Sequence, residues 1–400
     1  MAATTLSKGQ SGDEGVGIVN TAEKLGKCRE VVACEYGRKH SHPWVIAYSG
    51  GKDSTLLLQV TWEVLAALPE AHRHRQVHVV GNDTLVESPL VIRHLRASMD
   101  RIAMSAAEAG LPIKTRVTRP NIDQTFWVNV IGRGYIPPTR NFRWCTDRMK
   151  ILPTGSLLEG LVKRHGRAVL LVGTRKSESE QRRRNMAKRQ VSGTNMNAHG
   201  SISGCRVFAP LAELDDEDVW KVLMQRRAPW GGTHRNLITL YRNATGGECP
   251  LVLSKEDAPS CGTTSPRFGC WTCTVVAKDR SLRGLIASGH EEAPILERLF
   301  DFREWLVELR EDDANRQRVR RDGNTRSRSD GSRVLGPFTL EVRKTILGRL
   351  RALERATGWP LISESEQEVI EDIWRRDLIL EGCREALDRK TEAVGAEAIA

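Results

Sequence analysis

The sequence predicts an α/β fold in which helices cover both faces of an open parallel sheet. Two observations carry this prediction. Short apolar runs alternate with amphipathic helical stretches between residues 44 and 172. The run at 168–172, Ala-Val-Leu-Leu-Val, is apolar throughout, as in a strand that is buried on both faces. Such sheets bind ligands at the carboxyl ends of their strands, so we expect the functional site at that edge.

Each element of the sheet has a local signal. The first predicted strand is followed by a glycine-rich turn and by a helix whose apolar positions run from Leu56 to Leu68. The dipeptide Ser88-Pro89 combines a capping residue with a proline at the first helical position, and the helix that it opens ends at Gly110. Strands are predicted, in chain order, over 44–48, 77–81, 112–118 and 168–172.

Composition changes along the chain suggest four segments. We expect a disordered arm over 1–24, an α/β domain over 25–245, a cysteine-rich module over 246–285 and a helical C-terminal extension over 286–400. Periodicity in the extension predicts helices over 339–353 and 365–387. A basic loop at 314–333 precedes these two helices and contains seven arginines and two aspartates. We expect it to be a mobile loop or linker.

Charge and cysteine usage narrow the class of protein. Lys and Arg total 61 against 50 for Asp and Glu, and this net charge of +11 favours a polyanionic partner. The nine cysteines include four between 249 and 273, which is unlike a secreted disulfide framework and favours a metal site in a reduced chain. The start of the sequence lacks a signal-peptide pattern, and no apolar run is long enough to span a bilayer. We therefore expect a cytoplasmic protein with no membrane partner.

The first chemical motif is Ser-Gly-Gly-Lys-Asp-Ser-Thr at 49–55, between the first strand and its helix. Glycines at such a turn let the backbone approach a phosphate, which meets free N–H groups and the positive end of the helix. The motif is not a Walker A loop, because Ile46 stands at the first glycine position and Lys52 is followed by Asp53. The alternative is a glycine turn that only caps a core helix.

These residues resemble the SGGxDS loop of the PP-loop ATP pyrophosphatases, which share the adenine nucleotide alpha hydrolase-like fold and cleave ATP between the α and β phosphates. The resemblance implies that ATP is held by Ser49, Gly50, Gly51, Asp53, Ser54 and Thr55. It also suits Asp53 to a role linked to Mg²⁺. Lys52 stands at the variable position of the motif, where a lysine either adds charge or points to solvent.

Two later segments resemble the phosphoadenylyl-sulfate reductases. Asn-Asp-Thr at 82–84 is similar to the segment that lines their nucleotide, which implies contacts from Asp83 and Thr84. Residues 173–182 resemble their Gly-x-Arg-x-x-Glu-Ser segment, which implies contacts from Gly173, Arg175 and Arg182. The forked donors of arginine suit phosphate oxygens. We expect Asp53, Lys52 and Arg175 to be the catalytic residues. The basic run 182–189 is either a nucleic-acid contact or exposed charge.

The cysteine cluster predicts a metal centre. Cys249, Cys261, Cys270 and Cys273 lie in Gly- and Pro-rich sequence with only one close pair, so zinc is less favoured than iron–sulfur ligation. The stretch 268–274 resembles the Gly-Cys-x-x-Cys-Thr motif that binds a [4Fe–4S] cluster in adenylyl-sulfate reductases, and residues 143–150 resemble the Cys-Cys-x-x-Arg-Lys motif of the same proteins. The resemblance implies Cys145, Cys261, Cys270 and Cys273 as ligands, with Cys249 as the alternative. A redox pair or inert buried thiols remain the other interpretation.

Across its predicted ordered length the sequence resembles the DndC family of DNA phosphorothioation sulfurtransferases. The resemblance rests on 49–55, 173–182, 240–250, 268–274 and 336–339. It implies that sulfur replaces a non-bridging oxygen of a DNA phosphate while ATP is cleaved to AMP and pyrophosphate. It further implies three partners: DNA, a cysteine desulfurase as sulfur donor and other subunits of a Dnd modification complex. The basic loop 314–333 and the run 182–189 are the candidate DNA contacts, on charge alone.

Two alternatives stay open at this point. A sulfonucleotide reductase would match residues 44–275, but that family ends in a mobile Glu-Cys-Gly tail, whereas the last cysteine here, Cys383, falls in a predicted helix. A non-catalytic nucleotide-binding scaffold of a DNA-modification complex would bind ATP without cleaving it.

Overall fold

The computed structural model describes residues 20–190, 195–244, 269–276, 279–287, 289–327 and 329–397. In its α/β part the elements are α1 (Thr21–Tyr36), β1 (Trp44–Ala47), α2 (Lys52–Ala67), β2 (Val77–Asn82), α3 (Pro89–Glu108), β3 (Ile113–Thr118), α4 (Trp144–Thr146), α5 (Leu152–His165), β4 (Ala168–Leu171), α6 (Glu180–Arg189), β5 (Met196–Ala198), β6 (Cys205–Phe208), α7 (Asp216–Gln225) and α8 (Arg235–Ala244). The C-terminal part contains α9 (Arg280–Ala287), α10 (Ala293–Glu311), β7 (Arg326–Ser327), β8 (Arg333–Val334), α11 (Leu340–Thr357) and α12 (Glu364–Glu397).

The central sheet confirms the predicted fold class. Its strand order is β3-β2-β1-β4-β6-β5, and every neighbouring pair is parallel except β5 with β6. The four predicted strands are β1 to β4, each within two residues of its expected bounds. The order 3-2-1-4 places the switch in strand order between β1 and β4, so the loops that follow these two strands face each other at the carboxyl edge of the sheet.

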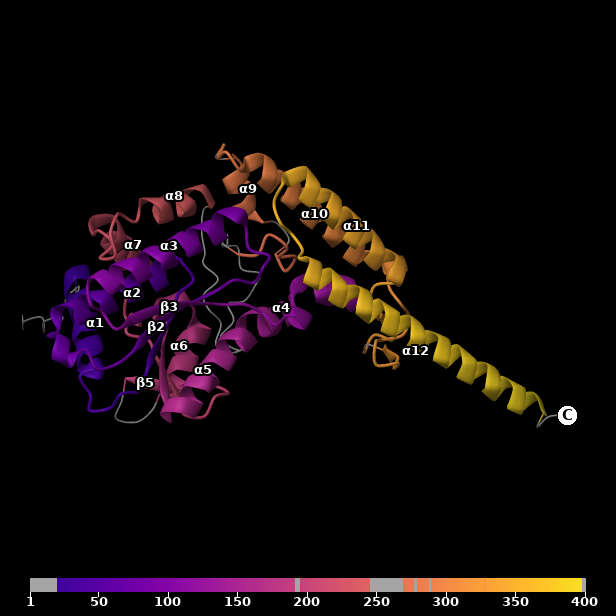
Figure 1. Ribbon diagram of the computed structural model, residues 1–400, viewed down its shortest axis with the longest axis horizontal. Helices are drawn as coiled ribbons and strands as arrows, with labels where there is room; N and C mark the ends of the chain where they lie inside the picture. Colours follow the sequence, from indigo (N-terminus) through magenta and orange to yellow (C-terminus); the bar gives the residue numbers. More distant parts are fainter. Residues whose placement is uncertain are drawn as a thin grey trace, which may run out of the picture.

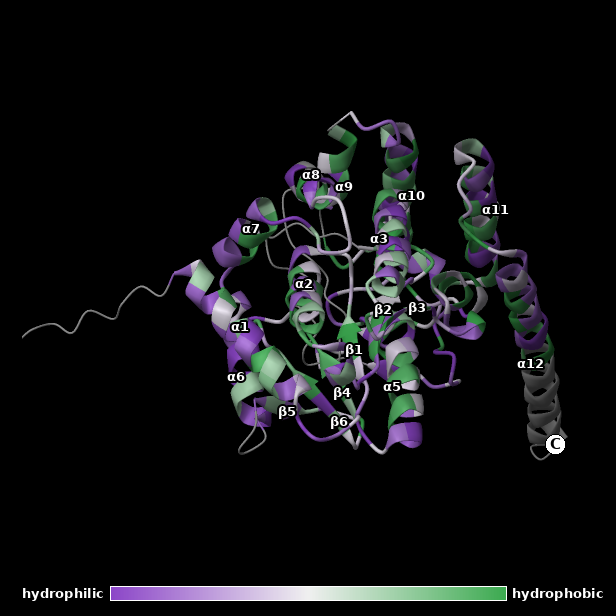
Figure 2. Cartoon of the chain, turned by 60° about the vertical axis from the view of Figure 1, so that its left-hand side comes forward, coloured by the Kyte–Doolittle hydropathy of each residue, from purple (hydrophilic) through white to green (hydrophobic). Residues whose placement is uncertain are grey.

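Helices cover both faces of the sheet. Along β1, Trp44 and Ile46 belong to a core shared with α1, α2, α3 and α7, whereas Val45 and Ala47 belong to a second core shared with α5. Figure 2 shows the strands as an apolar centre between helices whose outer faces are polar. Successive residues of a strand point to opposite faces, so a strand covered on both sides must be apolar at every position.

Helix α1 begins inside the segment that the sequence predicted to be a disordered arm. Asn20 caps it, because the Asn20 side chain accepts a hydrogen bond from the Glu23 N–H at 2.9 Å. The helix is tied to α7 by Lys24, whose Nζ lies 2.7 Å from Asp218 Oδ2, and this carboxylate also accepts a hydrogen bond from Thr21. The predicted boundary at residue 24 is therefore wrong for residues 21–24, and residues 1–19 lie outside the described residues.

The C-terminal helices share a third core with the middle of the chain. This core contains Trp127, Trp144 and Trp271 together with side chains of α10, α11 and α12. Trp374 of α12 is fixed to it by a hydrogen bond of 2.8 Å from its indole N–H to the Ile131 carbonyl. Beyond this contact α12 continues away from the body of the molecule (Figure 1). None of the helices among the described residues is long and apolar enough to cross a membrane.

The basic loop 314–333 is more ordered than the mobile loop or linker that the sequence predicted. It contains the short antiparallel pair β7 and β8. Arg316 donates to the Gly336 and Leu335 carbonyls at 2.7 and 2.9 Å, and Arg321 forms an ion pair of 2.8 Å with Asp377 of α12. At least two of its arginines therefore hold the loop against the protein.

Candidate nucleotide and sulfur site

The predicted phosphate loop lies where β1 ends and α2 begins. Gly50 has φ +77°, a conformation that side chains disfavour, and a Cβ there would lie 3.3 Å from the His94 ring. The Ser54 hydroxyl donates to the Gly51 carbonyl at 3.0 Å and closes the loop on itself. Gly51, at the N-cap of α2, supplies no side-chain cap, and the Lys52 N–H lies 3.4 Å from the Tyr241 hydroxyl. The N–H groups of its first turn are therefore directed at the carboxyl edge of the sheet, where an anion would meet them.

Four charged side chains meet beside this loop. Arg175 Nε lies 2.6 Å from Asp53 Oδ1, and Lys52 Nζ lies 3.0 Å from Asp53 Oδ2. Asp216 joins them, with its Oδ1 at 3.0 Å from Arg175 and 3.4 Å from Lys52. Lys52, Asp53 and Arg175 are all less than a tenth exposed, whereas Asp216 is open to solvent. The three predicted catalytic residues are thus brought together, and Lys52 points inward rather than to solvent.

The charge balance of this cluster limits what it can do. Two cations and two carboxylates cancel, and both oxygens of Asp53 lie against a cation, Oδ1 against Arg175 and Oδ2 against Lys52. Among the described residues, no group of three or more His, Cys, Asp or Glu side chains is arranged to hold a metal. The arrangement instead suits an exchange of ion pairs, in which a polyphosphate takes the place of carboxylate partners around the lysine and the arginine.

The segment after β4 approaches the loop closely. A Cβ on Gly173 would lie 2.9 Å from the backbone carbonyl carbon and oxygen of Asp53, so only glycine fits there. The backbone N–H of Arg175 donates to Glu178 Oε1 at 2.8 Å, and the other oxygen of Glu178 pairs with Arg182. Gly173 and Arg175 therefore contact the phosphate loop directly. Arg182 is linked to Arg175 through Glu178.

The segment after β2 supplies the remaining predicted nucleotide contacts. Asp83 and Thr84 are both buried. Asp83 is held by Arg96 at 2.9 Å and by the Leu85 N–H at 3.0 Å, and Leu85 has an unusual φ of +67°. Thr84 donates a hydrogen bond of 2.8 Å to Glu87. Both residues lie at the predicted sheet edge, and Asp83 acts there as an anchor for two arginines, the second being Arg119 at 3.4 Å.

A cysteine thiol lies against this same segment. Cys270 Sγ is 3.3 Å from Thr84 Oγ1 and 3.6 Å from Glu87 Oε1. The backbone fixes the contact, because Glu87 and Cys270 form a β-bridge and the Trp271 N–H donates to the Val86 carbonyl at 3.0 Å. Burial, reinforced by the Glu87 carboxylate, raises the pKa of the Cys270 thiol well above its usual value. The thiol is accordingly held in its protonated form.

The predicted cluster ligands are only partly described. Cys273 follows Cys270 in one turn, with its N–H donating to the Cys270 carbonyl at 3.0 Å, and Cys145 lies half-buried against the third core. Cys249 and Cys261 lie outside the described residues. The described cysteines do not form a complete cluster site.

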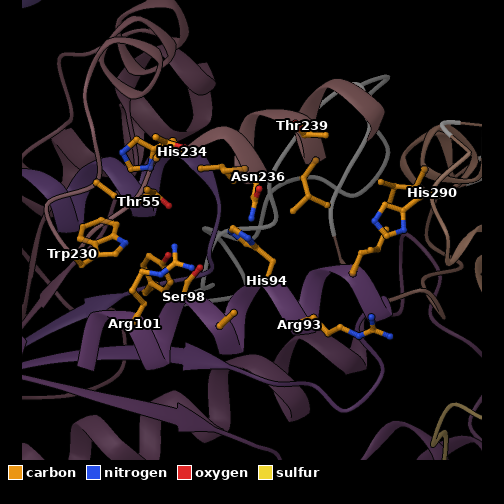
Figure 3. A pocket seen from close by; sticks show the side chains of 18 residues that line it. Thr55, Arg93, His94, Ser98, Arg101, Trp230, His234, Asn236, Thr239 and His290 are labelled. Carbon is orange, nitrogen blue, oxygen red and sulfur yellow. The ribbon is translucent and has the colours of Figure 1, made fainter. Parts of the chain in front are cut away.

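An open groove of about 430 Å³ adjoins the phosphate loop. Tyr48 and Thr55 reach its floor from the loop, α3 forms one wall and α8 with the preceding turn forms the other. Figure 3 shows the Asn236 amide and the His94 ring facing each other across it. His94 also contacts the Gly50 carbonyl at 3.1 Å, so it separates the groove from the turn of the loop.

Several of these residues were not found from the sequence. Asp216 carries no motif of its own. Glu178 and Tyr241, whose hydroxyl lies 3.4 Å from the Lys52 N–H, fall inside the resembling segments 173–182 and 240–250, but the sequence assigned them no role. The Asp215–Asp218 capping box at the start of α7 is a readable signal and would have placed Asp216 in the first turn of a helix. His94 could not be inferred, because nothing local relates it to Gly50.

Comparison with known protein families identifies the family of the chain. The sequence model of the phosphoadenosine phosphosulfate reductase domain matches residues 43–276, which is more than half of the chain. The chain belongs to this family. The matched residues run from β1 to just beyond Cys273, so they include the loop, the charged cluster and the Cys270 contact. Helices α10, α11 and α12 lie outside the match.

Solved structures give more distant likenesses. The phosphoadenylyl-sulfate reductase of Candida auris is 15% identical, with 54% of this chain and 89% of that chain covered at a TM-score of 0.32. The U34-tRNA thiolase NcsA of Methanococcus maripaludis, solved with its [4Fe-4S] cluster, is 13% identical, with 72% and 79% covered at 0.33. The NH3-dependent NAD synthetase of Campylobacter jejuni is 14% identical, with 56% and 78% covered at 0.34. No curated protein matches the chain.

Proposed function

We propose that the chain is an ATP-dependent sulfurtransferase of Dnd-type DNA phosphorothioation. The observation that carries the proposal is the 3.3 Å approach of the Cys270 sulfur to Thr84, at the sheet edge where the phosphate loop also lies. A thiol beside the nucleotide segment suits a reaction that both consumes ATP and moves sulfur. The net charge of +11 supports a polyanionic acceptor. The working partners are DNA, a cysteine desulfurase and other Dnd subunits, in the cytoplasm.

The proposed chemistry begins with activation of the acceptor. A non-bridging oxygen of a DNA phosphate attacks the α-phosphorus of ATP, and pyrophosphate leaves. The terminal sulfur of a persulfide then attacks the DNA phosphorus, and AMP leaves with the oxygen. A thiol finally breaks the S–S bond, so that sulfur stays on the phosphorus and the two thiol sulfurs become a disulfide. The desulfurase supplies the persulfide and cellular thiols supply the two electrons.

The residues of the charged cluster act by position and charge in this scheme. The N-terminal turn of α2 and the side chains of Lys52 and Arg175 stabilise charge on the leaving pyrophosphate. Asp53 keeps both cations oriented before ATP arrives. The Glu87 carboxylate, 3.6 Å from Cys270 Sγ, is placed to accept the thiol proton when that sulfur reacts.

One structural observation disfavours the reductase alternative. In a sulfonucleotide reductase the attacking thiol comes from a mobile C-terminal tail. Here Cys383 belongs to α12, which is helical from Glu364 to Glu397 and extends away from the sheet edge (Figure 1).

The test combines the chain with duplex DNA, ATP, cysteine, its desulfurase and a thiol. Mass spectrometry of the digested DNA is expected to show dinucleotides in which one phosphate oxygen is replaced by sulfur, together with one pyrophosphate for each sulfur. The matched control is Asp53→Asn, which keeps the size of the side chain and removes its charge. Formation of pyrophosphate without thiophosphate would show that the proposed sulfur-transfer step is wrong. ATP binding without cleavage would favour the scaffold, and reduction of a sulfonucleotide with thioredoxin would favour the reductase.

A further inference from the structure

We propose that the groove between α3 and α8 is the track in which one strand of the acceptor DNA lies, with its phosphates on the Arg101 and Ser98 side chains. This inference rests on the proposed function and names the surface through which the acceptor is held. It differs from the DNA contacts expected from charge alone, which were the run 182–189 and the loop 314–333.

The lining of the groove has the chemistry of phosphate-backbone contacts. Its polar residues are almost entirely arginine, histidine, hydroxyl and amide side chains, and no carboxylate is among them: Arg93, Arg101, His94, His234, His290, Ser98, Thr55, Thr233, Thr239 and Asn236. Arg, Ser, Thr and Asn side chains make most protein contacts to nucleic-acid phosphates. A site built for a cation would show the opposite composition.

One wall carries a usable guanidinium. Arg101 is exposed at the rim and has no carboxylate partner among the described residues, whereas Arg93 is neutralised by its ion pair with Glu292. Ser98 precedes Arg101 by one helical turn, and Figure 3 shows the two side by side on α3. The turn that approaches them, at Gly231 and Gly232, has positive φ at both glycines, so the chain passes close to Arg101 without a side chain between them.

The floor carries a second sign of a polar ligand, at a residue that the loop motif also assigns to ATP. Thr55 is 3% exposed, and its Oγ1 has no hydrogen-bond partner within the described parts of the chain although it lines the groove. Leaving a buried hydroxyl unpaired costs about 1–3 kcal/mol, so such an atom usually meets a ligand or an ordered water. Asn236, in the first turn of α8, also lines the groove. The positive N-terminal end of α8 favours an anion there.

The groove also has the right place and size. It reaches Tyr48, which precedes the phosphate loop, and Thr55, the last residue of that loop. A strand lying in the groove therefore passes beside the proposed ATP site. A volume of about 430 Å³ is far too small for a duplex and suits one or two phosphodiester units. A DNA strand in the groove therefore has one side facing the phosphate loop.

The test measures binding of labelled duplex DNA to the full chain by fluorescence anisotropy over a range of salt concentrations. Arg101→Gln is expected to weaken binding roughly fivefold near physiological salt and to reduce the slope of log affinity against log salt by about 0.9, the loss of one phosphate contact. Ser98→Ala is expected to weaken binding less and to leave the slope unchanged. The matched control is Lys163→Gln, an exposed cation at the far end of α5, which should change neither quantity. Thermal unfolding checks that each variant is folded.

The possible failures are distinguishable. If the wild-type chain binds no DNA at any salt concentration, the groove and the DNA acceptor of the proposed function are both wrong. If it binds DNA and Arg101→Gln behaves like Lys163→Gln, the groove alone is wrong. If Arg101→Gln weakens binding of inorganic phosphate and leaves DNA binding unchanged, the groove takes a small anion and the proposal is overturned.

Discussion

Arg175 Nε lies 2.6 Å from Asp53 Oδ1, and both side chains are buried. This pair joins the loop after β4 to the first turn of α2, so the two sides of the switch in strand order are held by one ionic contact. Removing one member of a buried pair leaves a charge without compensation. The shape of the phosphate loop therefore depends on a residue from a distant part of the sequence.

The first prediction concerns this pair. Asp53→Asn and Arg175→Gln are each expected to reduce ATP-dependent pyrophosphate release by roughly a hundredfold. Arg175→Gln removes a positive charge at the leaving group, and Asp53→Asn removes the carboxylate that orients Lys52 and Arg175. The double variant should be little worse than the poorer single variant, because the second change removes a partner already lost. Effects that simply add in the free energy of activation would show that the two residues act independently.

A second prediction tests the close approach at Gly173. Gly173→Ala places a Cβ 2.9 Å from the backbone of Asp53, so it should lower the free energy of unfolding by about 1–3 kcal/mol and weaken ATP binding at least tenfold. Gly155→Ala is the matched control, because a Cβ there meets nothing within 4 Å inside α5 and should be neutral or slightly stabilising. Denaturant titration and ATP titration check both. Equal behaviour of the two variants would rule out steric contact at Gly173.

A third prediction concerns iron. If Cys270 and Cys273 hold a cluster, Cys270→Ser and Cys273→Ser should each lose at least half of the iron and sulfide taken up on anaerobic reconstitution. Cys34→Ser, at an exposed position on α1, should retain the wild-type content. Unchanged iron content in all three variants would exclude these two cysteines as ligands and favour Cys270 as a thiol that works without a metal.

The fourth prediction is a loss of stability in mild acid. Burial lowers the pKa of His78 and of His234 from 6.5 to about 4, so both are neutral when folded and take up a proton on unfolding. Their stabilising contribution is complete above the unfolded pKa near 6.5 and is lost as the pH falls toward 4. Near pH 5.5 the cost is about 1 kcal/mol for each histidine.

His234→Gln isolates one of these groups. The variant should be less stable than wild type at neutral pH, since His234 packs against Trp230 and hydrogen-bonds Gln59 at 2.9 Å, yet it should lose less stability between pH 7 and pH 5.5. The exposed His72→Gln provides the control. Urea unfolding at the two pH values measures the difference, and parallel losses in wild type and His234→Gln would contradict a buried neutral histidine at this position.

The sequence was sufficient for the sheet because its strands are short-range features. The runs that became β1 and β4 are apolar at every position, and Ser88-Pro89 marked the start of α3 without knowledge of its neighbours. Helix α1 was missed because its stabilising partners, Asp215 and Asp218, lie almost two hundred residues later. A helix that is fixed by distant ion pairs leaves only a weak local pattern.

The candidate site likewise combines features that a local stretch of sequence predicts with features that depend on distant residues. The loop at 49–55 could be found because its glycines and helix start are contiguous. Whether Lys52 pointed inward could not be decided, because the answer depends on Asp216 from α7. The contact between Thr84 and Cys270 joins two segments that the sequence identified separately, and only the fold brings them within 3.3 Å.

The strand at one edge of the sheet has a consequence for how copies of the chain meet one another. Within the described parts of the chain β3 pairs with β2 on one side only, and the exposed residues of β3 include Lys114 and Arg116. An open strand edge is a template for strand addition from a second molecule, and long cationic side chains on it make that addition costly, because two such edges would bring like charges together. These two cations thus guard the sheet against self-association, and replacing both residues by threonine would expose an aggregation-prone edge.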